Sequence, residues 1–472
     1  MGLTLSRSLF EDPKDTWHEE PGTASASRGV AHLNDTKCTY RPHMTLYTNL
    51  MERRAVDDGS RPIFGWRMKD PETGVVGDYE WVTYDAFLDQ VADVAAGMKH
   101  ALGLSRQEPV GIFSKNRYEW VLVEHAANRM AYQLVPLYDT LGPQAVPFIV
   151  NHTEMRVLFC GKQQLTTFLG VLSECSSVKI IVQFENDVDA AQKNEAQAKG
   201  VEIKTLRELI SVGRNKPVNA DPPKPEDIAT ICYTSGTTGA PKGAMLTHSC
   251  MVSAAHSAKT PDPLYADDVH LSYLPLAHVF ERAIQAAFID AGACIGFYQG
   301  DVTKLVDDFA ALKPTVILGA PRVFNRIHDK IVNNVQKAGG VKKSLFDYAY
   351  ATKKAALADG YITHAFWDAI LFNKIKQVIG GRTRLLMSGS APISPEIKEF
   401  LQIVFCCPMI EGYGMTETAS VTSLSTPAFE TGPHCGLPVP GLEICLVDVP
   451  EMNYTSQDQP KPRGEICVRG PN

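Results

Sequence analysis

The chain contains 472 residues, 44% hydrophobic and 21% charged, and its formal net charge at pH 7 is −7. This length predicts about two to four packed units, and the composition is that of an ordinary globular protein. A protein whose main role is to hold nucleic acid needs a basic stripe that releases counterions, so the negative balance argues against that class. We therefore expect no nucleic acid partner.

The cysteine pattern and the hydropathy exclude two further classes. The eleven cysteines are odd in number, are scattered along the chain and include no Cys-x-x-Cys pair. This predicts reduced thiols, not a disulfide framework or a zinc site. The most apolar long window, Val279 to Tyr298, carries Glu281, Arg282 and Asp290, so we expect no transmembrane helix.

The N-terminus shows no secretory signal peptide pattern, but "MGLTLS" fits the Met-Gly-x-x-x-Ser/Thr pattern for myristoylation at Gly2. An unmodified flexible terminus is the alternative, and a single acyl chain would anchor only weakly. We expect a cytoplasmic protein and leave peripheral membrane association and the oligomeric state open.

The first half of the chain alternates strand-like runs with helix-like segments. After Thr83, a candidate N-cap, the apolar residues Phe87, Val91, Val94 and Met98 recur at helical spacing, and Gly103 ends the pattern. The runs "PVGIFS", "QLVPLY", "RVLFCG" and "KIIVQF" follow, with helical segments between them. This βαβ rhythm predicts a largely parallel sheet that is covered on both faces.

A Pro-rich segment from Asn215 to Asp227 separates the first half from a second series of the same kind. After Thr418 the helical segments stop and short strands follow. The sequence therefore predicts an α/β fold with two doubly wound, mostly parallel sheets, flanking helices and a small β-barrel-like subdomain. The predicted segments are an N-terminal extension (1–45), a first α/β subdomain (46–222), a second α/β subdomain with a nucleotide site (223–420) and a β-rich subdomain (421–472).

The stretch "YTSGTTGAPKGAMLTH", from Tyr233 to His248, carries the strongest chemical signal. It follows a β-rich run, so its glycines and hydroxyls would lie at the carboxyl end of a strand, where open α/β sheets bind ligands. Glycine backbone N–H groups can converge on an anion, and Lys242 adds a mobile positive charge. A Walker loop is excluded because Pro241 stands where the second Gly belongs. A loop that binds nothing is the alternative, but the density of hydroxyls favours phosphate.

The same stretch resembles the phosphate-loop signature of the adenylate-forming superfamily. Three later motifs stand in the family's order: "YLPLAHVFER" (Tyr273 to Arg282), "SGSAP" (Ser388 to Pro392) and "EGYGMTET" (Glu411 to Thr418). Four further stretches, "NRYEW", "VPLYDTLGPQAV", "GFYQGDV" and "LKPTVILGAPRVFNRI", are similar to the eukaryotic long-chain fatty acyl-CoA synthetase branch. The resemblance extends from about Tyr40 to Asn472.

The resemblance implies roles for these motifs. Tyr413 would stack on adenine, Thr416 would bond the α-phosphate, and Glu417 would hold Mg²⁺ as a hard oxygen ligand together with Thr238. His278 would lie near the acyl carboxylate, so the predicted catalytic residues are Lys242, Thr416, Glu417 and His278. The predicted nucleotide-binding residues are Thr234, Ser235, Gly236, Thr237, Thr238, Gly239, Lys242, Gly389, Ser390, Ala391, Glu411, Gly412, Tyr413, Gly414, Met415 and Thr416.

Each of these motifs also has a structural alternative. Tyr413 could pack at a strand end, and Glu417 could complement the dipole in the first turn of a helix. "SGSAP" could be a simple strand-to-helix turn. His278 could be a capping residue, and Arg322, at a predicted helix start, could form a surface salt bridge instead of meeting an anion.

The resemblance implies an AMP-forming ligase that activates a long-chain fatty acid with ATP and Mg²⁺ and passes the acyl group to coenzyme A. The alternatives are another acid-activating enzyme, such as an aryl-CoA ligase or an amino-acid adenylation domain, or a fragment that binds nucleotide and acyl chain without turnover. In the family, a ribose-binding aspartate and a small C-terminal domain with a catalytic lysine lie beyond the position of Asn472. We therefore expect the chain to be the large N-terminal domain, with impaired turnover on its own.

Overall fold

The computed structural model describes residues 41, 43–70, 72–138, 144–234, 240–259, 262–427 and 434–472, together with the strand backbone of 27–29. Gly2 lies outside these residues. The described chain divides into two compact units. Unit 2 comprises Arg41–Ala255 and Leu264–Leu312, and unit 1 comprises His256–Pro263 and Lys313–Asn472.

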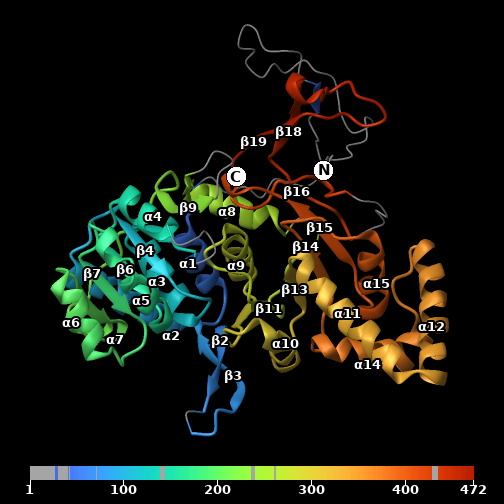
Figure 1. Cartoon of the computed structure of the whole chain (residues 1–472), viewed down its shortest axis with the longest axis horizontal. Helices are drawn as coiled ribbons and strands as arrows, with labels where there is room; N and C mark the ends of the chain where they lie inside the picture. Colours follow the sequence, from blue (N-terminus) through green and yellow to red (C-terminus); the bar gives the residue numbers. More distant parts are fainter. Residues whose placement is uncertain are drawn as a thin grey trace. The chain divides into compact units, whose positions relative to one another are not determined.

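Unit 2 contains a seven-stranded sheet in the order β10-β9-β5-β4-β6-β7-β8, in which only β10 runs antiparallel to its neighbour (Figure 1). Its strands are β4 (Pro109–Phe113), β5 (Gln133–Pro136), β6 (Val157–Cys160), β7 (Ile180–Gln183), β8 (Glu202–Thr205), β9 (Ile228–Thr234) and β10 (Lys242–Thr247). A second group of strands in the unit is β11 (Val269–Ser272), β12 (Cys294–Phe297), β2 (Pro62–Lys69) and β3 (Val76–Thr83), of which only β3 is antiparallel.

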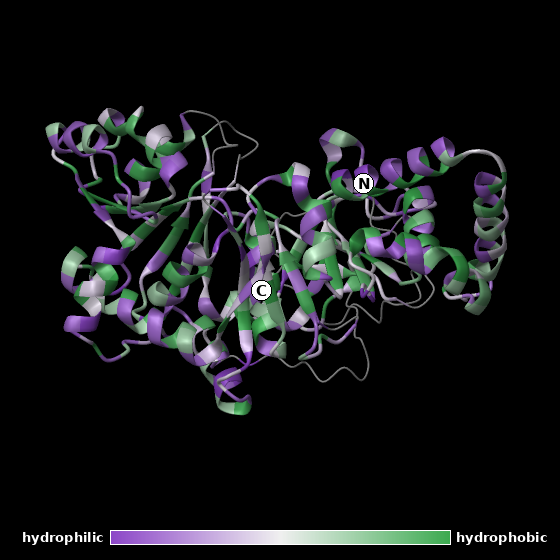
Figure 2. Ribbon diagram, turned by 90° about the horizontal axis from the view of Figure 1, so that it is seen from below, coloured by the Kyte–Doolittle hydropathy of each residue, from purple (hydrophilic) through white to green (hydrophobic). Residues whose placement is uncertain are grey.

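The helices of unit 2 follow the strands in alternation. They are α1 (Leu46–Val56), α2 (Tyr84–Leu102), α3 (Tyr118–Arg129), α4 (Ala145–Thr153), α5 (Lys162–Leu169), α6 (Ala190–Ala198), α7 (Leu206–Asn215), α8 (His248–Ser257), α9 (Val279–Ala291) and α10 (Leu305–Leu312), with short 3₁₀ turns at Leu172–Glu174 and Val302–Lys304. Residues of α4 and α5 join those of β4 to β8 in one buried core. In Figure 2 the strands are mostly apolar, while the helices alternate apolar and hydrophilic residues, as expected for helices that cover a sheet.

The helix predicted after Thr83 is confirmed. The side chain of Thr83 accepts a hydrogen bond from the backbone N–H of Ala86, and Gly103 ends α2 in the left-handed conformation with φ +61°. The four apolar residues that defined the helical period, Phe87, Val91, Val94 and Met98, are buried. Local signals were sufficient here because cap, period and terminator all agree.

Unit 1 contains a mainly parallel arrangement of β13 (Val316–Gly319), β14 (Leu385–Ser388) and β15 (Met409–Tyr413), extended by the antiparallel β16 (Ser423–Leu424) and β17 (Leu437–Pro438). A separate antiparallel sheet consists of β1 (Ser27–Gly29), β18 (Glu443–Val447) and β19 (Glu465–Arg469). The helical elements are α11 (Pro321–Ala338), α12 (Gly340–Ala358), α13 (Ala365–Trp367), the π-helical turn η5 (Asp368–Phe372), α14 (Asn373–Lys376), η6 (Gln377–Ile379), α15 (Pro395–Phe405), η7 (Thr416–Thr418) and η8 (Pro450–Met452).

The predicted α/β class with mainly parallel sheets is therefore confirmed. Within the described residues, no helix combines the length and the hydropathy that a bilayer span requires.

Candidate nucleotide site

The predicted phosphate loop connects β9 to β10, two antiparallel neighbours in unit 2. Lys242, the first residue of β10, lies opposite Thr234, the last residue of β9, and Gly243 lies opposite Tyr233. Thr234 is half-buried and Lys242 is exposed. The five residues between them in the predicted site, Ser235, Gly236, Thr237, Thr238 and Gly239, lie outside the described residues. The loop thus leads into an antiparallel strand, whereas a Walker loop leads into a helix.

Gly243 has a steric reason for its place after Lys242. A Cβ atom there would lie 2.8 Å from Ile231 Cγ2 and 3.1 Å from the ring of Tyr233. The Tyr233 ring cannot give way easily, because it is buried and its hydroxyl is 2.6 Å from His152 Nδ1. The absence of a side chain at Gly243 lets Tyr233 pack across the hairpin and fixes the two strands next to the loop.

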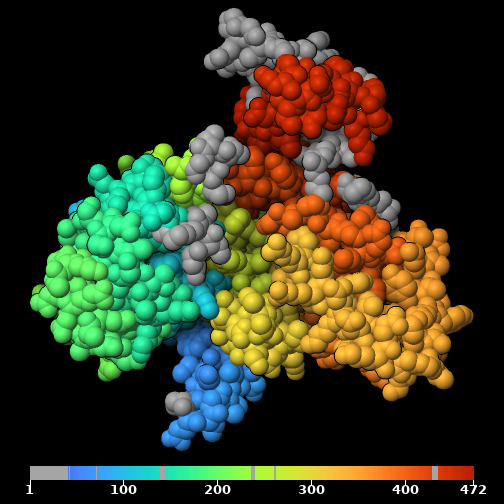
Figure 3. Space-filling model, viewed as in Figure 1, coloured from blue at the N-terminus to red at the C-terminus, as the bar shows by residue number. Residues whose placement is uncertain are grey.

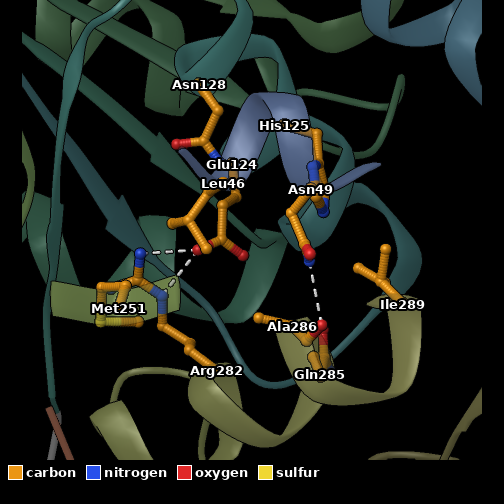
Figure 4. A pocket seen from close by; sticks show the side chains of 10 residues that line it. All are labelled: Leu46, Asn49, Glu124, His125, Asn128, Met251, Arg282, Gln285, Ala286 and Ile289. Atoms are coloured by element: carbon orange, nitrogen blue, oxygen red, sulfur yellow. Dashed lines mark hydrogen bonds and ion pairs between the residues drawn. The ribbon is translucent and has the colours of Figure 1, made fainter. Parts of the chain in front are cut away.

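A buried ion pair between Arg282 and Glu124 supports β9, and Figure 4 shows the two side chains. Arg282 on α9 donates from Nε to Glu124 Oε1 on α3 at 2.7 Å, and from Nη1 to Thr230 Oγ1 at 2.7 Å. The Thr230 hydroxyl in turn donates to the carbonyl of Leu134 on β5 at 2.7 Å. The Arg282 and Glu124 side chains are 1% and 9% exposed. A buried pair of this kind tolerates the loss of one partner poorly, so it holds α3, α9, β5 and β9 in one arrangement.

Sequence reasoning missed Arg282 as a site-supporting residue. It is the last residue of the "YLPLAHVFER" motif and interrupts an apolar run, and that interruption was the available signal. Charged residues are almost never fully buried unless they are paired, so a charge inside an apolar helix indicates a buried partner.

His278, in the same motif, is the N-cap of α9. Its Nδ1 accepts a hydrogen bond from the backbone N–H of Phe280 at 3.2 Å. Desolvation by the surrounding protein lowers the pKa of His278, and the capping bond also favours the neutral ring because Nδ1 must be unprotonated to accept it. The structural alternative of a capping residue is therefore present.

The pocket next to the Arg282–Glu124 pair is not a substrate site. It is lined by Leu46, Asn49, Glu124, His125, Asn128, Met251, Arg282, Gln285, Ala286 and Ile289 (Figure 4). Its volume of about 10 Å³ is close to the minimum that a single water needs. Neither a nucleotide nor an acyl chain fits there, so this pocket is a packing feature of unit 2.

In unit 1 the structure brings two of the predicted motifs together. Strands β14 and β15 are parallel neighbours, with Ser388 opposite Glu411, so "SGSAP" and "EGYGMTET" leave the sheet at the same edge. Gly389 is buried, whereas Ser390 and Ala391 are exposed. Ser390 adopts a left-handed backbone conformation with φ +68°, which costs free energy for a residue other than Gly and is common at functional sites.

Glu411, predicted to bind nucleotide, is engaged in a structural ion pair. Its Oε1 accepts a hydrogen bond from Lys398 Nζ on α15 at 2.9 Å, and its backbone N–H donates to Ser425 Oγ at 2.8 Å. Both side chains are mostly buried, with 11% and 12% exposed. Lys398 was missed at the sequence level, because nothing in the spacing of α15 shows which strand it faces.

Gly414 permits a close backbone approach after β15. A Cβ atom at this position would lie 1.5 Å from the carbonyl oxygen of Ser420, which is far inside contact distance. The segment that approaches it is itself strained, since Ala419 and Ser420 have φ values of +48° and +97°. Only glycine fits at Gly414, so the turn that carries the rest of the motif depends on it.

The remaining motif residues lie at or near the surface. Tyr413, Met415 and Thr416 are half-buried, and Glu417 is exposed on the short turn η7. Partial burial raises the pKa of the Tyr413 phenol, so the ring is neutral at physiological pH. Gly412 is opposite Leu424 in the ladder. Arg322, on the first turn of α11, is exposed as well.

No group of three or more His, Cys, Asp or Glu side chains that could hold a metal ion occurs in the part of the chain that the structure describes. The two predicted metal ligands are Glu417, whose carboxylate is exposed, and Thr238, which lies outside that part.

Comparison with known proteins defines the class. The model of the AMP-binding enzyme family matches residues 60–472, and the chain therefore belongs to this family. The fold is similar to that of the adenylation domain of a carboxylic acid reductase from Segniliparus rugosus in complex with AMP and a carboxylic acid, with a TM-score of 0.73 and 22% identity over 92% of this chain and 68% of that one.

Two curated relatives are more similar in sequence. Long chain acyl-CoA synthetase 7, peroxisomal, from Arabidopsis thaliana is 47% identical over 84% of this chain and 57% of its own length. Long-chain-fatty-acid–CoA ligase 1 from Homo sapiens is 37% identical over 96% of this chain and 65% of its own length. The chain thus spans less than two thirds of the length of either relative.

Proposed function

We propose that the chain is the large nucleotide-binding part of an AMP-forming long-chain fatty acid–CoA ligase. The observation that carries the proposal is the sequence identity of 47% to a long chain acyl-CoA synthetase over 84% of the chain. The placement of "SGSAP" and "EGYGMTET" at one sheet edge in unit 1 supports it, because open α/β sheets bind ligands at the carboxyl ends of their strands.

In the proposed reaction, a fatty acid carboxylate oxygen attacks the α-phosphorus of ATP. A bond forms between that oxygen and phosphorus, the bond to the bridging oxygen breaks, and pyrophosphate leaves. The thiolate of coenzyme A then attacks the acyl carbon, and AMP leaves as the thioester forms. The substrates carry all reacting atoms, so the side chains act by positioning and by neutralising charge.

The residues of unit 2 and unit 1 have different tasks in this proposal. Lys242 and Thr234, with the hydroxyls of the loop between them, would bind the β- and γ-phosphates. Tyr413 would contact adenine, and Thr416 the α-phosphate.

Glu417 and Thr238 would hold Mg²⁺ together with phosphate oxygens. An exposed carboxylate suits this role because Mg²⁺ prefers hard oxygen ligands and keeps several waters. When bound, the ion would neutralise developing charge on the phosphates.

ATP–pyrophosphate exchange tests the acid class. We expect exchange driven by palmitate to exceed exchange driven by benzoate-type acids or by amino acids, because each buried CH₂ of an acyl chain adds roughly 0.8 kcal/mol. Faster exchange with an aromatic acid or an amino acid would reject the fatty acid assignment and favour another member of the family. Nucleotide binding without exchange by any acid would favour a binding module.

A further inference from the structure

One stretch of unit 1 concentrates exposed apolar side chains. Of the fifteen large hydrophobic residues that are exposed among the described residues, six lie between positions 341 and 370. Single exposed apolar residues are normal on a protein surface, but a cluster marks an interaction site. These six residues form what we name the α12 patch: Val341, Leu345, Tyr348, Tyr361, Phe366 and Ile370.

The patch spans α12, the loop after it, α13 and the turn η5. On α12, Val341, Leu345 and Tyr348 follow each other at intervals of four and three, so they lie on one side of the helix. The buried residue Trp367 connects this stripe to the next element, with its ring 5.7 Å from that of Tyr348 and 4.9 Å from that of Phe366. Ile370 lies four residues after Phe366.

A different side of α12 is used for packing. Phe346, Ala349 and Lys353 are buried, and Lys353 donates to Asp368 Oδ1 at 2.6 Å and to the carbonyl of Ile403 at 2.9 Å. Helices α11 and α15 lie between α12 and the strands β13 to β15 (Figure 1). The segment around α12 lies at the surface in the space-filling view of Figure 3, and the six patch side chains are 41–86% exposed.

The segment that carries the patch is basic, although the chain as a whole is acidic. Between Pro321 and Lys376 the sequence has ten Lys and Arg against four Asp and Glu, a balance of +6, in a chain whose net charge is −7. Lys342 adjoins Val341, and Lys374 lies four residues after Ile370; both are exposed. The apolar patch is thus combined with a local positive charge.

We propose that the α12 patch docks on the surface of an anionic lipid bilayer. Aromatic and aliphatic side chains enter the boundary between headgroups and acyl chains, and lysines beside them pair with anionic headgroups. The basic charge argues against a second copy of the chain as the occupant, because two such surfaces repel each other. This inference goes beyond the proposed ligase reaction and does not depend on it, although a bilayer is also where a long-chain acid dissolves.

Co-sedimentation with vesicles tests the inference on the full chain made without an N-terminal acyl group. The vesicles consist of phosphatidylcholine with or without phosphatidylserine, at low and at high salt. Three variants are compared with the parent: L345S/Y348S/F366S in the patch, K342E/K374E beside it, and the control V75S/M452S, which removes two equally exposed apolar side chains elsewhere. Circular dichroism and thermal unfolding establish that each variant is folded.

The parent is expected to bind phosphatidylserine vesicles better than neutral ones and to lose binding at high salt. Both the apolar and the charge variant should bind at least about tenfold more weakly, and the control should match the parent. The inference is overturned if the parent binds no vesicles, or if the patch variants bind like the parent. It is also overturned if the apolar variant changes only the dimer fraction in light scattering, which would assign the patch to self-association.

Discussion

The two regions that carry the predicted nucleotide-binding residues are held in place in different ways. In unit 2, Lys242 and Thr234 stand at a hairpin tip whose support is remote, through Thr230 to the buried pair of Arg282 and Glu124. In unit 1, residues of the motif make the supporting contacts directly, since Glu411 pairs with Lys398 and Gly414 packs against Ser420. A motif residue can therefore be a ligand-binding candidate in one region and a structural element in the other.

The largest effect is expected from breaking the remote support. Arg282→Met leaves Glu124 buried without its partner, which should destabilise unit 2 by about 3–5 kcal/mol. Urea unfolding measures the loss. The double variant Glu124→Leu with Arg282→Met should recover most of the stability because no charge is left unpaired. If the single variant loses less than the double variant, the pair does not support the hairpin as argued.

The corresponding test in unit 1 is Gly414→Ala. A methyl group 1.5 Å from the Ser420 oxygen forces the backbone to move, and we expect a loss of about 3 kcal/mol together with loss of nucleotide binding. The matched control is Gly412→Ala, whose Cβ would meet the end of the flexible Leu424 side chain at 2.7 Å. It should lose about 1 kcal/mol. Equal losses in the two variants would contradict the assignment of the close approach to Gly414.

These two regions show how much of the candidate site could be predicted from the sequence. The strand-exit motifs were predicted correctly as features of strand ends in an α/β fold, because glycine and hydroxyl patterns are local. The supporting partners were not predicted: Glu124 is 158 residues from Arg282, and Lys398 is 13 residues from Glu411. Periodicity shows that a residue faces the core but not which element it meets there.

The order of the strands in the sheets could not be predicted from the sequence either. The Pro-rich segment from Asn215 to Asp227 suggested that the run after it begins a new series, yet β9 pairs with β5 in the same sheet as the strands before that segment. Likewise β2, early in the chain, pairs with β12. Alternation of strand and helix indicates a parallel sheet, whereas strand order depends on which crossover packs best, and that information is not local.

Substitutions of exposed residues that are predicted to bind ATP or Mg²⁺ should reduce binding without reducing the stability of the fold. Lys242→Ala and Glu417→Gln change exposed side chains at the two sites, so unfolding free energy should shift by no more than about 0.5 kcal/mol. If they contact ATP and Mg²⁺ as proposed, kcat/KM for pyrophosphate exchange should fall about a hundredfold. The control Lys193→Ala removes an exposed lysine of α6, an element that carries neither motif, and should leave both quantities unchanged. A loss of stability in place of activity would show that these side chains are structural.

The last prediction concerns the pH dependence of stability in the unit 2 region. His248, directly after β10, is fully buried, its Nδ1 lies 3.4 Å from the backbone N–H of Leu46, and burial lowers its pKa from 6.5 to about 3. Asp227 opposes this shift, while Arg282 and Arg106 add to it. The unfolded chain therefore takes up the proton first as the pH falls. The stabilising contribution is complete above pH 6.5 and is lost between 6.5 and about 3, by up to about 1.4 kcal/mol per pH unit.

His248→Asn keeps a hydrogen-bond acceptor but cannot titrate, so it should flatten the pH dependence of unfolding in this range. Part of the slope should remain, because burial also lowers the pKa of His125. Urea unfolding of parent and variant across this pH range provides the comparison. An unchanged slope in the variant would mean that the pKa of His248 is not lowered in the folded state, which would contradict the prediction.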